Sequence, residues 1–514
     1  MGLKRAGFKC LAAIDFDDSA VKTYKTNFPH VRNVLKKDLR RYQPEKLGDL
    51  LGHRRVDVIV GGPPCQGFSH ARHVDGANHG KRLVFDPRRY LYRKFLSYVA
   101  YFQPRVFVIE NVLGIRSAAG GEFFTRVQVE ARALGYRVHG EEIKAWQFGV
   151  PQKRQRQLIV GTRRELPIFS GKQYIKPTHV LPNEPSARNL RPVTTLWEAI
   201  GDLTPIKAGE GLKERDYDSQ RQFDHFARYG GRYLLDVLEV HKSIKLTAHV
   251  ARPHSKRDLR DFARLREGEH SAQAIKRGEK MKFPYDRLTF KDRFTRQRRS
   301  GLCSTVVAHV SKDGLMFIHP TQNRSLTVRE VARVQSFPDW FSFPERTPAF
   351  RLIGNAVPPL VGEALGRGIR KFLNESIGRS HSQNQIPVPL SEKQALDWLV
   401  PVFTAAGQRM LRDVSRAEFL RAWSSIGFLH FWLHPDSALE NGNWVLDRRD
   451  EKSALNRVAP DLVSPIFELS GWPMSLVPIA IEGHRRLSAD KLRVRDFYCS
   501  AAHIAGASRF VTKH

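Results

Sequence analysis

The 514-residue chain has little cysteine and no long apolar run. Its four cysteines, Cys10, Cys65, Cys303 and Cys499, form no C-x-x-C pair, so neither a disulfide framework nor a metal site is expected. No run of about 18 apolar residues occurs, so no membrane contact is expected, and the first residues lack the apolar core of a secretory signal. These absences favour a reducing, cytoplasmic compartment.

Acidic residues are scarce relative to basic ones. The chain carries 85 Lys and Arg against 52 Asp and Glu, a formal net charge of +33. Residues 381–514 hold 16 basic and 14 acidic residues, so nearly all of the excess lies in residues 1–380. Such a concentration of positive charge favours a polyanionic partner, and nucleic acid fits best.

One cysteine stands in an unusual setting. Residues 56–60, Val-Asp-Val-Ile-Val, predict a strand that is buried on both faces, as in parallel sheets. Gly61 and Gly62 follow, and two prolines then precede Cys65. Glycines allow close approach of backbone to a ligand, and prolines restrict the chain around the thiol. Because open α/β sheets bind ligands at the carboxyl ends of their strands, we expect Cys65 to face a ligand.

Acidic residues follow the first two apolar runs of the chain. Residues 8–14 predict a strand that ends at Asp15, and residues 18–27 predict a helix. Asp38 follows a second short run. An acid at the end of a strand in such a unit commonly binds ribose hydroxyls, although a helix cap is an equally good interpretation of either residue alone.

A second buried strand ends in an acid. Residues 89–102 predict a helix, and residues 105–109 predict a strand that is followed by Glu110. Because both apolar strands should end at the same edge of one sheet, we expect Cys65 and Glu110 to lie close together.

The segment 131–162 predicts a meander of two strands with a basic stretch between them. In an extended chain, alternation would place Gln152, Arg154 and Arg156 on one face. This pattern is typical either of a solvated basic edge or of a preorganised clamp for an anion or a carbonyl group.

The second half of the chain divides into three parts. Between about residues 175 and 300 the apolar periodicity weakens and basic residues and histidines interleave, which indicates a loop-rich recognition domain. Thr327 and Glu330 form a capping box that predicts a helix over 327–335, and residues 362–373 predict a final helix.

The C-terminal part differs in composition from the rest. Residues 375–388 predict a linker. Residues 389–514 are nearly charge-balanced, hold five of the eight tryptophans, and predict a mostly helical module. The module could bind a protein partner or dock on the main body.

Five motifs occur in order between residues 2 and 373. They are the Pro-Pro-Cys-Gln-Gly loop at 63–67, Glu110-Asn111-Val112, Gln152-x-Arg154-x-Arg156, the segment 324–335 with Phe337-Pro338-Asp339, and Gly354-Asn355-Ala356-Val357-Pro358-Pro359. In these motifs the chain resembles the DNA (cytosine-5)-methyltransferase family. The resemblance implies an α/β fold, a Rossmann-like S-adenosylmethionine-dependent methyltransferase sheet with an inserted target-recognition domain. The domains would be catalytic (1–174 and 321–374), recognition (175–320), linker (375–388) and C-terminal module (389–514).

The resemblance also implies a chemistry. The C5 carbon of cytosine is not nucleophilic, and addition of a thiolate at C6 makes it so, which is the role of Cys65. Glu110 would be the acid near the base, while Arg154 and Arg156 would hold its carbonyl and a phosphate. The base must leave the duplex to react, and the residues that would contact it or its loop are Gln66, Ser69 and Gln152. The residues that would bind S-adenosyl-L-methionine are Asp15, Phe16, Asp38, Pro63, Asn355 and Val357.

One departure from the family concerns the start. Family members open with a strand and a Phe-x-Gly-x-Gly-Gly loop just upstream of the region that matches residues 1–8 here. This first strand is missing from the sequence, so we expect exposed sheet edges. We also expect the coding sequence to extend upstream of Met1, because the downstream chemical residues are all present.

The sequence thus predicts an enzyme that methylates cytosine C5 in duplex DNA, through a covalent bond between Cys65 and C6 with base flipping. We expect a restriction-modification or orphan modification enzyme that is monomeric on DNA, and a cognate restriction endonuclease is a candidate partner. One alternative is a catalytically impaired DNA-binding remnant. Another is methylation of RNA, for which a tRNA-directed branch of the family gives precedent.

Overall fold

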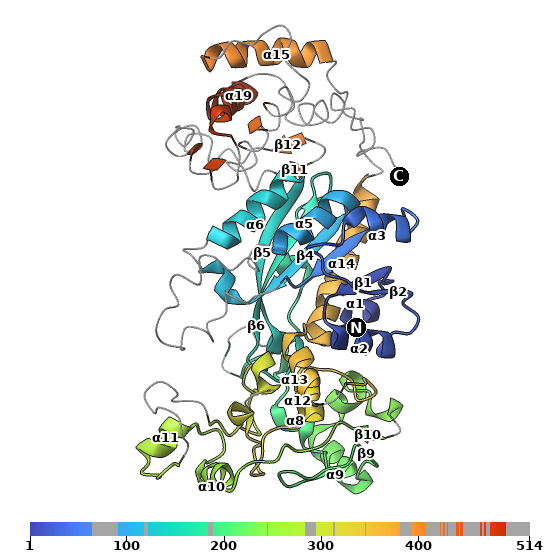
Figure 1. Cartoon of the computed structure of the whole chain (residues 1–514), viewed down its shortest axis with the longest axis vertical. Coiled ribbons are helices and arrows are strands. Elements are labelled where there is room, and N and C mark those ends of the chain that lie inside the picture. Colours follow the sequence, from blue (N-terminus) through green and yellow to red (C-terminus); the bar gives the residue numbers. More distant parts are fainter. Residues whose placement is uncertain are drawn as a thin grey trace.

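The computed structural model describes most of the first 380 residues and parts of the C-terminal region. The described ranges are 1–63, 91–117, 122–182, 184, 189–243, 245–282, 294–311, 314–344, 346–380 and 392–407, with parts of 422–489. Cys65, Gln66 and Ser69 lie outside them. The molecule is elongated, with a central sheet, the elements α8 to α11 at one end and the C-terminal helices at the other (Figure 1).

The central sheet has four strands in the order β3-β4-β6-β5. The strands are β3 (Val58–Gly61), β4 (Val106–Asn111), β5 (Tyr136–Lys144) and β6 (Gln155–Arg163). Strand β3 runs parallel to β4, whereas β6 is antiparallel to both β4 and β5. The predicted strand at 105–109 and the predicted meander are therefore confirmed.

Helices cover both faces of this sheet, as strand alternation requires. Val106 and Val108 of β4 pack toward α14 (Pro359–Ser380). Phe107 and Ile109, which point the other way, pack against α5 (Leu91–Phe102) and α6 (Glu122–Ala133). A run of large apolar residues on β4 is thus buried on both sides, and the α/β fold predicted from the sequence is confirmed.

A second, separate sheet contains the N-terminal strands. Strand β1 (Ala12–Asp15) pairs in parallel with β2 (Asn33–Lys36), and α2 (Asp18–Asn27) connects them. The helix is as predicted, with Asp17 as its N-cap. The strand, predicted from residue 8, begins only at Ala12. Helices α1 (Gly2–Arg5) and α3 (Pro44–Leu50) complete this part.

Strand β3 differs from its prediction. The sequence predicted burial on both faces, but Val60 is 44% exposed and the rest of β3 is only partly buried. Within the described ranges, β3 pairs only with β4 and β1 only with β2. Ile14 of β1 and Ile59 of β3 nevertheless pack in one apolar cluster under α3 and α5. Each sheet therefore has an edge without a partner strand there, and the lack of a neighbour explains the exposure of β3.

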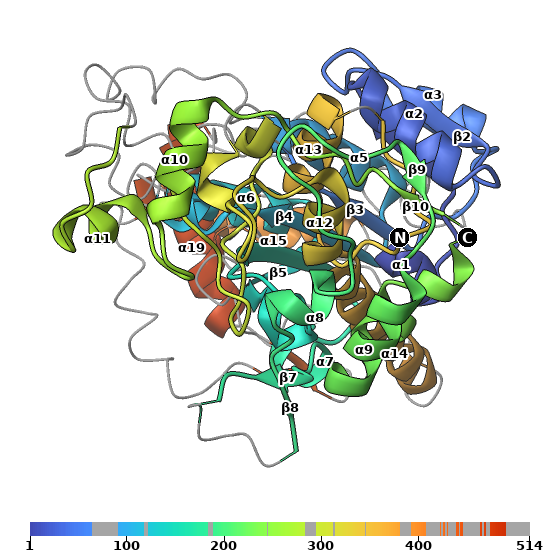
Figure 2. The same ribbon diagram turned by 90° about the horizontal axis from the view of Figure 1, so that it is seen from below.

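The described part of the region from 171 to 320 consists of short elements. They are α7 (Gly171–Tyr174), β7 (His179–Val180), β8 (Arg191–Pro192), α8 (Leu196–Ile200), β9 (Glu214–Arg215), α9 (Ser219–Tyr229), β10 (Leu246–Thr247), α10 (Lys256–Arg264) and α11 (Ser271–Lys276). Seen from below, α10 and α11 lie on one side and α9 on the other (Figure 2).

This region has two kinds of core. Helices α10 and α11 share a small apolar cluster of their own, centred on Phe262 and Phe294. In contrast, α8 packs in the largest cluster of the molecule together with α2, α12 (Val328–Val334) and α13 (Arg346–Asn355). The predicted recognition domain therefore shares a core with the predicted catalytic domain.

The helix predicted from its capping box is confirmed. Thr327 caps α12, accepting from the Glu330 amide, and the Glu330 carboxylate accepts from the Thr327 amide in return. Helix α14 is longer than predicted and continues to Ser380, so the first residues of the predicted linker 375–388 are helical. Residues 381–391 lie outside the described ranges.

The C-terminal region is helical but contains a hairpin that was not predicted. It comprises α15 (Glu392–Ala405), the paired strands β11 (Ala438–Glu440) and β12 (Asn443–Val445), and α19 (Val477–Ala489). Val129 of α6 packs in one apolar cluster with Phe467 and Ala480, so this region docks on the main body. None of the described helices has the length and apolar composition to cross a bilayer.

Candidate active site

The carboxyl end of β4 carries an acid paired with an arginine. Strand β6 runs antiparallel to β4, so its first residues lie beside the last residues of β4. Arg156 Nε lies 2.9 Å from Glu110 Oε1, and both side chains are 15% exposed. The pair is therefore fixed by the sheet yet still reaches the surface.

The described residues that precede Cys65 end next to this pair. Strand β3 is parallel to β4, with Gly61 opposite Ile109, so both strands end at the same edge. A Cβ atom on Gly62 would lie 3.4 Å from Glu110 Oε2. Asn111 Nδ2 donates a hydrogen bond of 3.2 Å to the carbonyl of Pro63, which ties the start of the loop to β4. The last described residue before Cys65, Pro63, is thus held beside Glu110.

The other two residues of the basic motif are buried in the protein. Arg154 is 1% exposed and donates to the carbonyls of Val306 (2.8 Å) and Ala356 (2.9 Å). Gln152 is fully buried; its amide donates to Val334 O (3.1 Å) and accepts from the Val306 amide (3.1 Å). Of the three residues expected on one face, only Arg156 contacts Glu110, because β6 begins at Gln155 and the preceding residues run beside 303–306.

The predicted cofactor residues at β1 lie at an open strand end. Asp15 is the last residue of β1, and its carboxylate accepts from the Asp17 amide at 2.8 Å. Phe16 is 69% exposed, which is unusual for a large aromatic side chain. Asp17 forms an ion pair with Arg351 of α13, and this hydrogen-bonded arginine lowers the pKa of Asp17. The pair connects the end of β1 to the helix that precedes Val357.

The remaining predicted cofactor residues follow β2 or lie at the end of α13 and just after it. Asp38 lies two residues beyond β2, and its hydrogen bonds with Arg40 lower the pKa of Asp38 to about 2. Asn355, the last residue of α13, is exposed, and Val357 is 36% exposed. These residues offer carboxylates, an exposed ring and an amide, which are the groups that ribose, a purine and an amino acid require, so they fit S-adenosylmethionine.

The sequence did not single out three residues that organise this edge. Asn111 fixes Pro63, Arg351 fixes Asp17, and Gln335 donates to the carbonyls of Ile353 (2.7 Å) and Ala356 (3.0 Å). Asn111 and Gln335 belong to motifs that the sequence does display, so their signal was present. No local signal marks Arg351.

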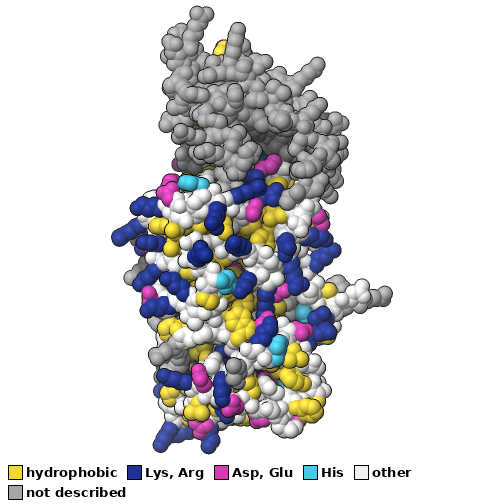
Figure 3. Space-filling model, turned by 90° about the vertical axis from the view of Figure 1, so that its right-hand side faces the viewer, with side chains coloured by type: hydrophobic (Ala, Val, Ile, Leu, Met, Phe, Trp, Pro, Cys, Tyr) yellow, Lys and Arg dark blue, Asp and Glu magenta, His cyan; other side chains and the backbone are white. Residues whose placement is uncertain are grey.

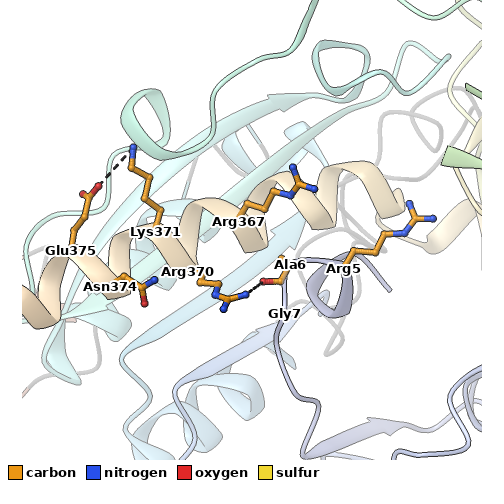
Figure 4. Close-up of a pocket in the computed structure, with 8 residues that line it drawn as sticks. All are labelled: Arg5, Ala6, Gly7, Arg367, Arg370, Lys371, Asn374 and Glu375. Atoms are coloured by element: carbon orange, nitrogen blue, oxygen red, sulfur yellow. Dashed lines mark hydrogen bonds and ion pairs between the residues drawn. The ribbon is translucent and has the colours of Figure 1, made fainter. Parts of the chain in front are cut away.

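A cavity of about 460 Å³ lies elsewhere, between α1 and α14 (Figure 4). None of the predicted site residues lines it. Its cationic side chains have partners within the protein: Arg5 pairs with Glu239 (2.8 Å), Lys371 with Glu375 (3.7 Å), and Arg370 donates to Ala6 O (3.2 Å). We therefore do not assign this cavity to the site.

One face of the molecule and the surface of α10 are basic. Lys and Arg side chains are spread over the described part of one face of the molecule, with fewer acidic side chains between them (Figure 3). On α10, Lys256, Arg257 and Arg260 are all exposed. The exposed basic side chains of α10 are thus available to a polyanion.

The fold and the site define an α/β enzyme with a carboxylate–guanidinium pair at its strand ends. A family model described as C-5 cytosine-specific DNA methylase matches residues 1–371. The chain is 34% identical over 410 residues to the type II methyltransferase M.DdeI of Desulfomicrobium norvegicum, covering 74% of this chain and 88% of that protein. It is 31% identical to the type II methyltransferase M.AgeI of Thalassovita gelatinovora, covering 72% and 96%.

A solved structure agrees. A prophage-encoded protein of E. coli, assigned as a DNA modification methyltransferase, matches with a TM-score of 0.55 at 26% identity, covering 73% of this chain and 95% of that one. The chain belongs to the C-5 cytosine-specific DNA methylase family. Its activity is that of a DNA (cytosine-5) methyltransferase.

Proposed function

We propose that the chain methylates C5 of cytosine in duplex DNA, with Cys65 as the nucleophile and Glu110 as the acid. One observation carries this proposal: the Glu110–Arg156 pair lies beside Pro63, which the Asn111 side chain holds in place. Cys65 follows Pro63 by two residues, a reach of at most about 7 Å for extended chain. Cys65 and Glu110 would therefore both be within reach of one cytosine ring.

Each residue would have a defined task. The Cys65 thiolate adds to C6, which makes C5 nucleophilic. Glu110 donates a hydrogen bond or proton to N3 of the ring and so stabilises the charge that the addition creates. Arg156 orients Glu110 through the 2.9 Å contact. After methylation, C5 loses its proton to solvent and the S–C6 bond breaks, which returns the Cys65 thiolate and releases 5-methylcytosine.

S-adenosylmethionine, when bound, supplies an electrophilic methyl group. We propose that Asp15 holds its ribose, that Phe16 stacks on its adenine and that Asp38 accepts from the adenine amine. Pro63, Asn355 and Val357 would line its methionine end. The exposure of Phe16 and the ion pair between Asp17 and Arg351 support this set.

The base must be flipped out of the duplex to reach these groups. We propose that Gln66 and Ser69 contact the flipped base or its phosphate. Gln152 and Arg154, whose polar atoms serve the protein's own backbone, would act by positioning instead. DNA would bind as the substrate of a single copy of the chain.

The relatives named as type II methyltransferases support a restriction-modification role, with a cognate endonuclease as the expected partner. A second candidate function is DNA binding with impaired catalysis. The partly exposed β3 favours it, as do the edges of β1 and β3 that have no partner strand among the described residues, because Asp15 and Pro63 lie at or near the ends of these strands.

Expression in a methylation-deficient host, followed by bisulfite sequencing, tests the proposal. The wild-type chain should produce 5-methylcytosine at one sequence context, and Cys65→Ala should not. Absence of methylation by the wild-type chain, together with retained DNA binding, would favour the second candidate. Methyl transfer to tRNA but not to duplex DNA would overturn the assignment of the substrate.

A further inference from the structure

Four segments that are far apart in the sequence meet at one buried polar cluster. Its members are Gln152, Arg154 and Gln335, none of them more than 1% exposed, and we call it the Arg154 cluster. Arg154 Nη1 donates to Val306 O at 2.8 Å, and Nη2 donates to Ala356 O at 2.9 Å and to Gly354 O at 3.2 Å. One guanidinium thus joins the segment 303–307 to residues 354–357, which are the last two residues of α13 and the two that follow them and which we call the loop 354–357.

The two glutamines close the cluster. Gln335 Nε2 donates to Ile353 O at 2.7 Å and to Ala356 O at 3.0 Å. Gln152 contacts the Gln335 side chain and also accepts from the Val306 amide at 3.1 Å. The carbonyl of Ala356 therefore has two donors, one from Arg154 and one from Gln335.

Close backbone packing makes the two segments move together. A Cβ atom on Gly354 would lie 2.4 Å from the carbonyl carbon of Val307 and 2.5 Å from the Ala308 nitrogen. Real side chains do not fit at such distances, so only glycine allows this approach. A shift of 303–307 must therefore displace the loop that carries Asn355 and Val357.

The segment 303–307 also continues into the recognition region. The Ser304 amide donates to Gln297 Oε1 at 2.9 Å. The neighbouring Arg296, which is 6% exposed, donates to Phe262 O at 2.7 Å and so reaches α10. Helix α10 carries the exposed Lys256, Arg257 and Arg260 on its surface. Hydrogen bonds and covalent neighbours therefore lead from a basic surface helix to the loop 354–357.

We propose that the Arg154 cluster couples the recognition region to the loop 354–357, so that duplex DNA and the methyl donor bind cooperatively. Arg154, Gln152 and Gln335 are positioning residues in this account. The inference rests on the proposed function, because it takes Asn355 and Val357 as cofactor residues. It adds that binding of DNA and binding of the methyl donor are energetically coupled, and it names the side chains that couple them.

The physical basis is the fork of the guanidinium. Its donors are fixed in one plane, so Arg154 can satisfy Val306 O and Ala356 O together only while the two segments keep one relative position. A lysine has a single ammonium group and cannot hold both carbonyls in that geometry. Coupling is reciprocal: if DNA tightens cofactor binding, the cofactor tightens DNA binding by the same factor.

Calorimetry with the full chain tests the inference. The dissociation constant of S-adenosylhomocysteine is measured with and without sheared duplex DNA from a methylation-deficient host. For the wild-type chain we expect DNA to tighten binding about 5-fold or more, a typical size for coupled sites. For Arg154→Lys the ratio of the two constants should fall to near one. If Arg154→Lys does not fold, Gln335→Met provides the same test at the other end of the cluster.

Arg329→Lys is the matched control. Arg329 is also fully buried, and it also binds the recognition region by donating to Thr247 O at 3.0 Å. Its hydrogen bonds do not involve the loop 354–357. This variant should lose stability and keep the coupling ratio. An unchanged ratio in Arg154→Lys, or an equal loss in Arg329→Lys, would overturn the inference. A wild-type ratio of one with normal methylation would overturn it and leave the proposed function intact, whereas loss of both binding and methylation would refute the proposed function.

Discussion

Two regions of the molecule are built from arginines and acids, and they differ in what covers them. Around α12, Arg324 pairs with Glu330 at 2.7 Å and Arg333 pairs with Asp202 at 2.6 Å, all within the core. At the carboxyl end of β4, Arg156 pairs with Glu110, and both side chains are 15% exposed. The same kind of ion pair is fully buried around α12 and partly exposed at the end of β4. We call the first the closed region and the second the open region.

In the closed region the polar atoms of the arginines bind groups of the protein itself. Arg333 also pairs with Asp339, and Arg329 lies 3.6 Å from that carboxylate. A buried charge is tolerated only when its hydrogen bonds are made within the fold, which explains why these residues hold the inserted region to α12. In the open region the Glu110–Arg156 pair is partly exposed. Burial, and not charge, therefore distinguishes the arginines around α12 from Arg156.

The largest expected effect concerns the open region. Glu110→Gln keeps the shape of the side chain but removes the acid, so the kcat for methyl transfer to duplex DNA should fall about 10²–10⁴-fold. Transfer of a tritiated methyl group measures this. The midpoint of thermal unfolding should drop less than it does for Arg333→Met. A Glu110→Gln variant that unfolds early would show that the pair is structural and would remove the contrast.

The next effect concerns the closed region. Arg333→Met leaves Asp202 and Asp339 buried without their cation, and the free energy of unfolding should fall by about 3–5 kcal/mol. Urea titration followed by circular dichroism measures the change. Arg367→Met on α14 is the control, because its surface pair with Glu363 contributes little, roughly 0–1 kcal/mol. Equal losses in the two variants would contradict the proposed difference between the regions.

A pH effect should follow from a buried histidine near α12. Burial lowers the pKa of His319 to about 3, with Glu330 3.6 Å away and Arg324 nearby. The unfolded chain takes up this proton at about pH 6.5, before the folded chain does, so stability falls as the pH drops below that value.

At pH 5 this histidine alone should cost about 2 kcal/mol relative to pH 7. His319→Asn retains an acceptor for the Gln322 amide and should reduce the difference in unfolding free energy between pH 7 and pH 5. Urea titrations at the two pH values measure it. An identical pH dependence in the variant would show that His319 is not buried in its neutral form.

The smallest effect concerns the cap of α12. Thr327→Ala removes the acceptor for the Glu330 amide and should cost about 1 kcal/mol. Thr327→Ser, which keeps the hydroxyl, should recover most of this loss. Thermal unfolding of the two variants and the wild-type chain measures the difference. If alanine and serine behave alike, the cap does not contribute to the closed region.

Local signals allowed part of the fold to be predicted. The helix at 18–27 and the helix after Thr327 have caps and periodic apolar residues, and both were found. The prediction that the strand before Cys65 and the strand before Glu110 end at one edge is confirmed as far as Pro63. It could be made because each of the two strands is marked by its own apolar run. The C-terminal hairpin, which such signals did not reveal, was missed.

Features that depend on distant partners could not be predicted. Whether β3 is buried depends on which strand lies beside it, and a single apolar run does not record that. The partners of Arg154 are backbone carbonyls about 150 to 200 residues away, which carry no sequence signal. Arg154 and Arg156 look alike in the motif, and only their surroundings distinguish a buried positioning residue from the partner of Glu110.

The central claim is that Cys65 forms a covalent bond with cytosine beside Glu110. Duplex DNA with 5-fluorocytosine in place of cytosine tests it, because fluorine at C5 cannot leave as a proton and the S–C6 bond therefore cannot break. With S-adenosylmethionine present, the wild-type chain should form a protein–DNA complex that survives denaturing electrophoresis, and Cys65→Ala should form none. Methylation of ordinary duplex DNA without any such complex, or an undiminished complex in Cys65→Ala, would contradict the account.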